Sequence, residues 1–203
     1  WYNTTDNVLR YKAPDGASVW ATGGNLNTGR RLAGGGTVGT ETSALCISGL
    51  DGYASKTENE GYNGTAWTEL ADVNADRYQA AAFGADSSSA IFCGGFGPPT
   101  GSTANESWNG SAWTETGVSM NTGRDSGAGA GISASAALYI SGNGGGGNGL
   151  GNVESWNGSA WTEVGDLNDG RYNLGGNGTQ TSAIAFGGND NPPTEAKTEE
   201  WNG

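Results

Sequence analysis

Four arginines recur at one fixed spacing and are the most regular candidates for chemistry in the chain. They lie 47 residues apart, at Arg30, Arg77, Arg124 and Arg171. Each repeat also contains a glutamate two residues before an aromatic side chain, at Glu60, Glu106, Glu154 and Glu199. A guanidinium group can form two parallel hydrogen bonds to one carboxylate, which can belong to the protein or to a ligand. The repeated pattern therefore predicts four arginine–carboxylate sites.

These sites have two interpretations. The arginines can form partly buried ion pairs with carboxylates of neighbouring sheets, which would be structural. Alternatively, they can form a ring of positive charge at one mouth of the fold that captures an acidic peptide or a sugar. The sequence leaves both interpretations open.

The sequence offers few residues suited to catalysis. The chain has no histidine, which removes the usual general base and the commonest metal ligand. Two carboxylates could act on a glycosidic bond, but no Asp or Glu pair stands out from its repeated copies. We therefore expect a protein that is not an enzyme and that uses no cofactor and no metal. A carbohydrate-active enzyme is the least favoured alternative.

The loops that differ most between repeats are the better candidates for binding. Variable loops that project from a rigid frame commonly carry recognition. Tyr53 and Phe96 could stack on sugar rings, and Asn189 and Asp190 could hydrogen-bond to hydroxyl groups. We predict that these four residues, together with the arginines, bind a ligand. Packing of the two aromatic rings against their own sheets is the alternative.

Composition and charge limit the fold class and the partners. Thirty-nine glycines would suggest disorder, but eight tryptophans and regular apolar runs favour a turn-rich all-β fold. The net charge of −12 opposes binding to a phosphate backbone, so nucleic acid is not an expected partner. No long apolar run or charged leader predicts membrane insertion or a signal peptide. Cys46 and Cys93 are one position apart in equivalent runs, which places them on opposite strand faces, so we expect no disulfide.

Each repeat of about 47 residues is expected to form four short antiparallel strands. The first is rich in Gly and Ala and suits a position near a common axis, and the second is a continuous apolar run. The third carries the Glu-x-aromatic motif, and an Asn-Gly turn joins it to the fourth, which reads Ala-Trp-Thr-Glu. Flanking pairs such as Trp156 and Trp161 are expected to pack between strands or sheets. The first strands are predicted at 32–38, 78–85, 126–132 and 172–179, and the second strands at 43–49, 89–95, 135–142 and 182–188.

This pattern resembles kelch-type β-propeller repeats. The resemblance is carried by the apolar residues before Gly187-Gly188, the aromatic residue of the third strand, the tryptophan of the fourth, and Asn-x-Gly-Arg before the next repeat. It implies a propeller of four-stranded antiparallel blades, with about four blades in 25–203, closed by N- and C-terminal strands. A larger ring is the alternative. Galactose oxidase has a similar propeller, but its copper site needs histidines, so that resemblance stops at the fold.

The first 24 residues depart from the repeat and are expected to form an N-terminal hairpin and closing strands. Residues 18–23 are expected to supply the fourth strand of the last blade. Trp1-Tyr2-Asn3-Thr4 resembles a hairpin of bacteriophage tail and fibre proteins that precedes a repeated domain.

The phage resemblance implies a non-enzymatic structural and binding module in a virion or outside the cell. Its loop face would attach to a host-surface glycan or protein, and other virion proteins would be its neighbours. A protein-interaction adaptor or a purely architectural decoration is the alternative function.

Overall fold

The computed structural model describes residues 2–3, 8–9, 22–34, 38–97, 100–190 and 194–203. All regular elements in these ranges are β-strands, which confirms the all-β class. The described part of the chain accordingly contains no helix that could cross a membrane.

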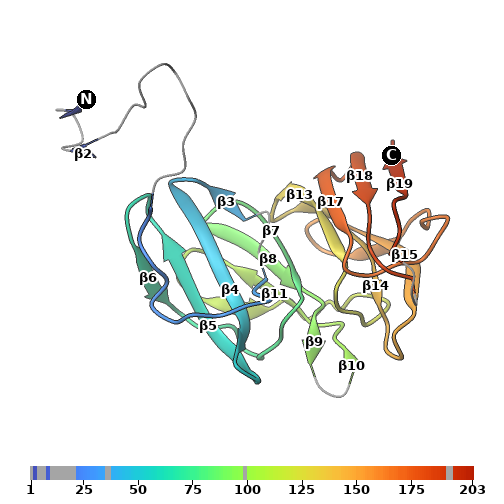
Figure 1. Cartoon of the computed structure of the whole chain (residues 1–203), viewed down its shortest axis with the longest axis horizontal. Coiled ribbons are helices and arrows are strands. Elements are labelled where there is room, and N and C mark those ends of the chain that lie inside the picture. The colour runs from blue at the N-terminus through green and yellow to red at the C-terminus, as the bar shows by residue number, and fades with distance from the viewer. Residues whose placement is uncertain (1, 4–7, 10–21, 35–37, 98–99, 191–193) are drawn as a thin grey trace.

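Four antiparallel sheets follow one another along the chain (Figure 1). The first contains β3 (Gly39–Thr40), β4 (Ser43–Asp51), β5 (Ala54–Tyr62) and β6 (Trp67–Leu70). The second contains β7 (Ala81–Asp86), β8 (Ser89–Cys93), β11 (Asn105–Trp108) and β12 (Trp113–Glu115). The third contains β13 (Ala128–Ser133), β14 (Ala136–Asn143), β15 (Gly149–Trp156) and β16 (Trp161–Glu163). The fourth has three strands, β17 (Gly175–Thr179), β18 (Ser182–Phe186) and β19 (Thr198–Trp201).

Two short hairpins complete the described strands. At the N-terminus, β1 (Tyr2–Asn3) pairs with β2 (Val8–Leu9). Between β8 and β11, β9 (Phe96–Gly97) pairs with β10 (Thr100–Gly101).

The Gly- and Ala-rich first strands lie side by side, as their composition predicts. Strand β7 lies between β3 and β13, and β13 packs against β17. Small residues are required here because the sheets approach closely. A Cβ atom at Gly129 of β13 would lie only 2.5 Å from the ring of Phe83 on β7.

A residue in the left-handed conformation precedes each first strand. Two positions after each arginine, φ lies between 54° and 57°, at Leu32, Gln79, Ser126 and Asn173. The amides of Gln79, Ser126 and Asn173 each donate to the carbonyl of the counterpart residue in the preceding repeat, at 3.0, 3.0 and 2.7 Å. Strands β7, β13 and β17 begin only after this residue, two or three residues later than the sequence predicted. The four residues form a continuous main-chain ladder.

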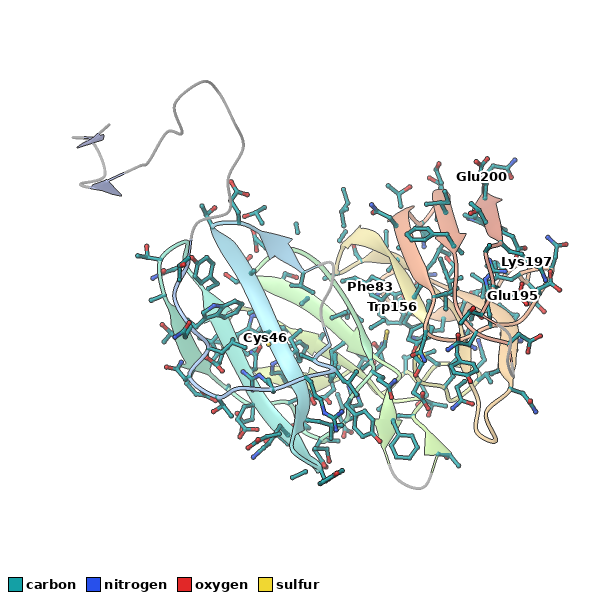
Figure 2. All side chains as sticks on the ribbon, in the orientation of Figure 1. Cys46, Phe83, Trp156, Glu195, Lys197 and Glu200 are labelled. Carbon is teal, nitrogen blue, oxygen red and sulfur yellow. The ribbon has the colours of Figure 1, made fainter. Side chains whose placement is uncertain are left out.

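Facing sheets bury apolar side chains between them. Phe83 and Ile91 of the second sheet pack against Tyr139 and Trp156 of the third (Figure 2). The rings of Trp156 and Trp161 lie 5.3 Å apart, and both are buried. These tryptophans are therefore packing residues, as expected.

Both cysteines are free, as predicted. Cys93 is buried between the second and third sheets, whereas Cys46 is half-buried in the first sheet.

The predicted closing strand at 18–23 falls mostly outside the described residues. Of this segment, only Thr22 and Gly23 are described. Gly23 lies next to the hydroxyl of Tyr62, and Gly24 lies next to the main chain of Thr65. The chain from Gly23 onward therefore runs along the first sheet.

Candidate functional site

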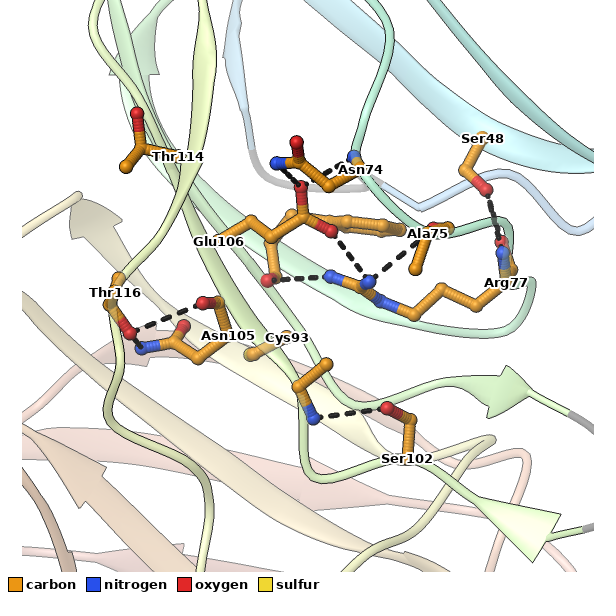
Figure 3. A network of polar contacts seen from close by, with 12 residues as sticks. Ser48, Asn74, Ala75, Arg77, Cys93, Ser102, Asn105, Glu106, Thr114 and Thr116 are labelled. Atoms are coloured by element: carbon orange, nitrogen blue, oxygen red, sulfur yellow. Dashed lines mark hydrogen bonds and ion pairs between the residues drawn. The ribbon is translucent and has the colours of Figure 1, made fainter.

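Each repeated arginine has a buried side chain paired with a glutamate, and an exposed asparagine donates to the same glutamate; we call these three residues the clamp. In the second sheet, Arg77 Nη1 donates to Glu106 Oε1 at 2.7 Å, and Nη2 donates to the Phe92 carbonyl at 3.2 Å. Asn74 donates its main-chain and side-chain N–H groups to Glu106 Oε2, at 2.8 and 2.7 Å (Figure 3). The Arg77 and Glu106 side chains are each only 1% exposed.

The clamp recurs in all four repeats. The ion pairs are Arg30–Glu60, Arg77–Glu106, Arg124–Glu154 and Arg171–Glu199. An asparagine three residues before each arginine donates to the same glutamate, from Asn27, Asn74, Asn121 and Asn168. All four arginine side chains are buried, with 0 or 1% of their surface exposed.

The sequence predicted the ion pairs but placed them wrongly. Each arginine pairs with a glutamate of the sheet that it enters, not with a neighbouring sheet, because the Asn-x-x-Arg segment folds over the third strand of its own sheet. The four guanidinium groups point into the protein, so they present no charge to solvent. This geometry favours the structural interpretation of the arginines. The asparagine donors were missed, although the regular Asn-x-x-Arg spacing signalled them.

Two serines link the clamps to the preceding sheets. Ser48 has a φ of 57°, and its hydroxyl accepts the amide N–H of Arg77 at 3.3 Å and lies 2.7 Å from the Lys56 carbonyl. Ser141 makes the equivalent contacts with Arg171, at 3.1 Å, and with the Leu150 carbonyl, at 2.6 Å. The end of the second strand is thereby tied to the clamp of the next repeat.

The predicted loop residues lie where the second strands end, and they differ in accessibility. Tyr53, in the turn between β4 and β5, is 99% exposed. Phe96 is half-buried, with its ring 5.2 Å from that of Tyr78. Asn189 is half-buried and pairs through its main chain with Tyr172, whereas Asp190 is exposed. Tyr53 and Asp190 are therefore the most accessible of the four.

Phe96 and Asn189 belong to a set of paired residues that sequence reasoning missed, and we call this set the rim. In each pair, the residue that follows a clamp arginine pairs through its main chain with a second residue. That second residue directly follows a glycine at the end of a second strand. The pairs are Arg31–Leu50, Tyr78–Phe96, Asp125–Asn143 and Tyr172–Asn189. Unlike the clamp residues, the rim residues differ in chemistry from repeat to repeat. Only the strand register brings them together, so residue type alone gave no signal.

Asp125 is the buried acidic residue of the rim. Its Oδ1 accepts a hydrogen bond from the Ser126 hydroxyl at 2.6 Å, while its Oδ2 has no hydrogen-bond partner among the described residues. Burial raises the pKa of this carboxyl group, and hydrogen bonds from Ser126 and Asn143 partly offset that effect.

We expect Asp125→Asn to stabilise the protein at pH 7. A carboxyl group whose pKa is raised by folding binds its proton more tightly in the folded state. Stability therefore falls as pH rises from the unfolded pKa through the higher folded pKa. The advantage of the variant should shrink as pH is lowered toward 4, which urea denaturation at both pH values measures.

Asp86→Asn is the matched control for this pH effect. Hydrogen bonds from the side chain and main chain of Ser88 lower the pKa of Asp86. The ionised Asp86 carboxylate therefore stabilises the folded state above the unfolded pKa, and this stabilisation is lost as pH falls through the folded pKa. Asp86→Asn should accordingly destabilise the protein at pH 7. If Asp125→Asn changed the free energy of unfolding equally at pH 7 and pH 4, the raised pKa of Asp125 would be contradicted.

The described residues contain no group of three or more Cys, Asp or Glu side chains arranged to hold a metal ion. In comparisons with known proteins, no family model and no curated sequence matches this chain. The function therefore has to be inferred from the geometry of the clamps and the rim.

Proposed function

We propose that the four sheets are blades of a kelch-like β-propeller. The succession of innermost strands β3, β7, β13 and β17 supports this architecture. The main-chain ladder supports it too, since one further step from Leu32 N to Asn173 O would complete a four-membered ring. The side chains of Gln79 and Asn173, two repeats apart, approach to 3.5 Å, which fits a small ring. An experimental structure in which Leu32 N and Asn173 O lie far apart would refute this closure.

We further propose that the chain is a non-enzymatic structural and binding module of a phage virion or tail fibre. In this proposal, the rim and the adjoining loops attach to a host-surface glycan or protein. One observation carries the proposal: the repeated arginines are buried in the clamps, whereas the residues that differ between repeats gather at the rim end of the sheets. A rigid repeated frame with a variable surface is typical of recognition by repeat proteins.

The chemistry of the rim end suits sugars and polar peptides. The exposed ring of Tyr53 offers an apolar face, and the Tyr78–Phe96 pair offers a second aromatic surface. The exposed side chain of Arg31, which donates to the Gly52 carbonyl beside Tyr53, and the exposed Asp190 add hydrogen-bonding groups at this end. A ligand at this end would meet aromatic and polar groups together.

Binding to a glycan array and to intact host cells tests the attachment function. We expect Tyr53→Ala to weaken binding about tenfold or more without changing the fold, because the ring is exposed. Ile132→Ala is the control, since Ile132 is 68% exposed at the opposite end of the third sheet. Absence of binding to both glycans and cells would refute the attachment function.

A further inference from the structure

A groove lies between the second and third sheets, at the end of these sheets opposite the rim. Its volume is about 750 Å³, within the range of ligand pockets in proteins. The second sheet lines the groove with all four of its strands and with the linker that follows β12, and the third sheet contributes the turns after β13 and β15. The groove is therefore built from the interior of the chain, between residues 85 and 159.

The turn between the first and second strands has one equivalent position in three of the sheets. An indole N–H identifies this position, because it donates to the carbonyl there in each case. The bonds run from Trp108 to Ser87, from Trp156 to Ala134 and from Trp201 to Gln180. Ser87, Ala134 and Gln180 are therefore counterparts.

The side chain at this position bridges to the preceding sheet in two of the three interfaces. Between the first and second sheets, the Ser87 hydroxyl lies 2.8 Å from the Ser43 hydroxyl. Between the third and fourth sheets, the Gln180 carboxamide donates to the Ser155 hydroxyl at 2.9 Å and to the Trp156 carbonyl. A polar side chain thus joins the two sheets at each of these places.

The interface that holds the groove lacks such a bridge, because Ala134 has only a methyl group. The acceptors for a bridge are nevertheless present. The strand registers make Ser107 and Trp108 the counterparts of Ser155 and Trp156, and both line the groove. The Trp108 side chain lies in the core between the first and second sheets, so its main chain faces the groove. The groove therefore offers two hydrogen-bond acceptors to which the chain supplies no carboxamide.

The rest of the lining suits a neutral ligand with many hydroxyl groups. Further hydroxyls come from Ser89, Thr114, Thr116, Ser133, Ser135 and Ser159. Val118 and Ala134 add a partly buried apolar patch. Glu115 is the one charged side chain among the described residues of the lining, and it is exposed. Its negative charge, together with the net charge of −12, opposes an anionic ligand.

We propose that this groove binds a neutral saccharide that contains an N-acetylhexosamine. The acetamido N–H donates to the Ser107 hydroxyl, as Gln180 Nε2 does to the equivalent serine. The neighbouring sugar hydroxyl donates to the Trp108 carbonyl, and the acetamido methyl group packs against Val118 and Ala134. An amide N–H beside a hydroxyl thus reproduces the two donors of the Gln180 carboxamide. The inference rests on the groove alone and is independent of ligand binding at the rim.

Titration of the isotope-labelled full chain with N,N′-diacetylchitobiose, followed by two-dimensional NMR, tests the proposal. We expect saturable shifts of the amide signals of Ser107, Trp108 and Ala134, with a Kd below about 5 mM. Cellobiose, which carries hydroxyl groups in place of the two acetamido groups, is the matched ligand. It should bind at least about fivefold more weakly, because it lacks the amide N–H and the methyl group.

The variant Ala134→Gln locates the site, because it introduces the bridge of the last interface into the groove. Its carboxamide can bond to the Ser107 hydroxyl and the Trp108 carbonyl, so it should abolish binding of the disaccharide. Ile132→Gln is the matched control, since Ile132 is 68% exposed on the same sheet and outside the groove lining. This control should bind as the unaltered chain does. Ser107→Ala should weaken binding about threefold to tenfold.

The outcomes that would overturn the proposal are distinct from a failure of the attachment function. Absence of saturable shifts up to about 20 mM, equal binding of cellobiose, or unchanged binding by a folded Ala134→Gln would each overturn it. If Ala134→Gln fails to fold, Ser107→Ala and the two disaccharides still decide the question. Shifts confined to the rim would overturn the groove site while supporting the rim. Tighter binding of N-acetylglutamine amide than of the disaccharide would also overturn it, and would assign the groove to a glutamine side chain of a protein.

Discussion

Replacing Arg77 with alanine should lower the free energy of unfolding by about 3 to 5 kcal/mol. The Arg77 side chain is 1% exposed, and it donates to Glu106 and to the Phe92 carbonyl. Its removal leaves the Glu106 carboxylate buried with Asn74 as its remaining donor. A buried charge that has lost its partner costs several kcal/mol, more than the intact pair contributes. Urea denaturation of the variant and the unaltered chain measures the loss.

Arg31→Ala is the matched control for this substitution. Arg31 is exposed, and its guanidinium group donates to the Gly52 carbonyl at 3.1 Å. We expect its removal to change the free energy of unfolding by less than about 0.5 kcal/mol. The double variant Arg77→Met/Glu106→Leu removes both charges and should recover most of the loss. A loss below about 1 kcal/mol for Arg77→Ala would contradict a structural role of the clamp.

The sequence predicted the second strands well because each is an apolar run bounded by Ser and Gly. The predicted ranges 43–49 and 89–95, for example, correspond to β4 and β8. Strands β7, β13 and β17 began later than predicted, after a residue in the left-handed conformation, and β3 (Gly39–Thr40) lies outside the predicted range 32–38. Leu32 and Gln79 adopt this conformation, which residues other than Gly, Asn and Asp seldom do. The residue types of Leu32 and Gln79 therefore did not indicate this conformation. The conformation follows from the main-chain ladder that links successive repeats.

The candidate site was predictable only in part, for a related reason. The common spacing of Arg77 and Glu106 with their counterparts revealed which residue types pair. It did not reveal that the linker folds back onto its own sheet, because that depends on the path of the chain between sheets. The rim pair Asp125–Asn143 was hidden because main-chain register, not residue type, joins the two residues. The repeated positions thus revealed the clamp residues from the sequence, whereas the pairing of the variable rim residues became apparent only from the structure.

Replacing Trp156 with alanine should lower the free energy of unfolding by about 3 to 5 kcal/mol. Its side chain is fully buried between the second and third sheets, and its ring lies 5.3 Å from that of Trp161. Its indole N–H donates to the Ala134 carbonyl at 3.0 Å, and that bond would be lost as well. The tightly packed neighbours, which include Phe83, can collapse only partly into the space left behind.

Trp201→Ala is the informative comparison because Trp201 occupies the same position in the fourth sheet. Its indole N–H also donates to a carbonyl, that of Gln180 at 3.0 Å, so the lost hydrogen bond is matched. Trp201 is only partly buried and lines a cavity of about 300 Å³ between the third and fourth sheets, so its removal loses less buried apolar surface and fewer contacts. We therefore expect a loss of about 1 to 2 kcal/mol in the same urea measurement. Equal losses in the two variants would mean that the last interface is packed as tightly as the one before it, which would contradict a cavity beside Trp201.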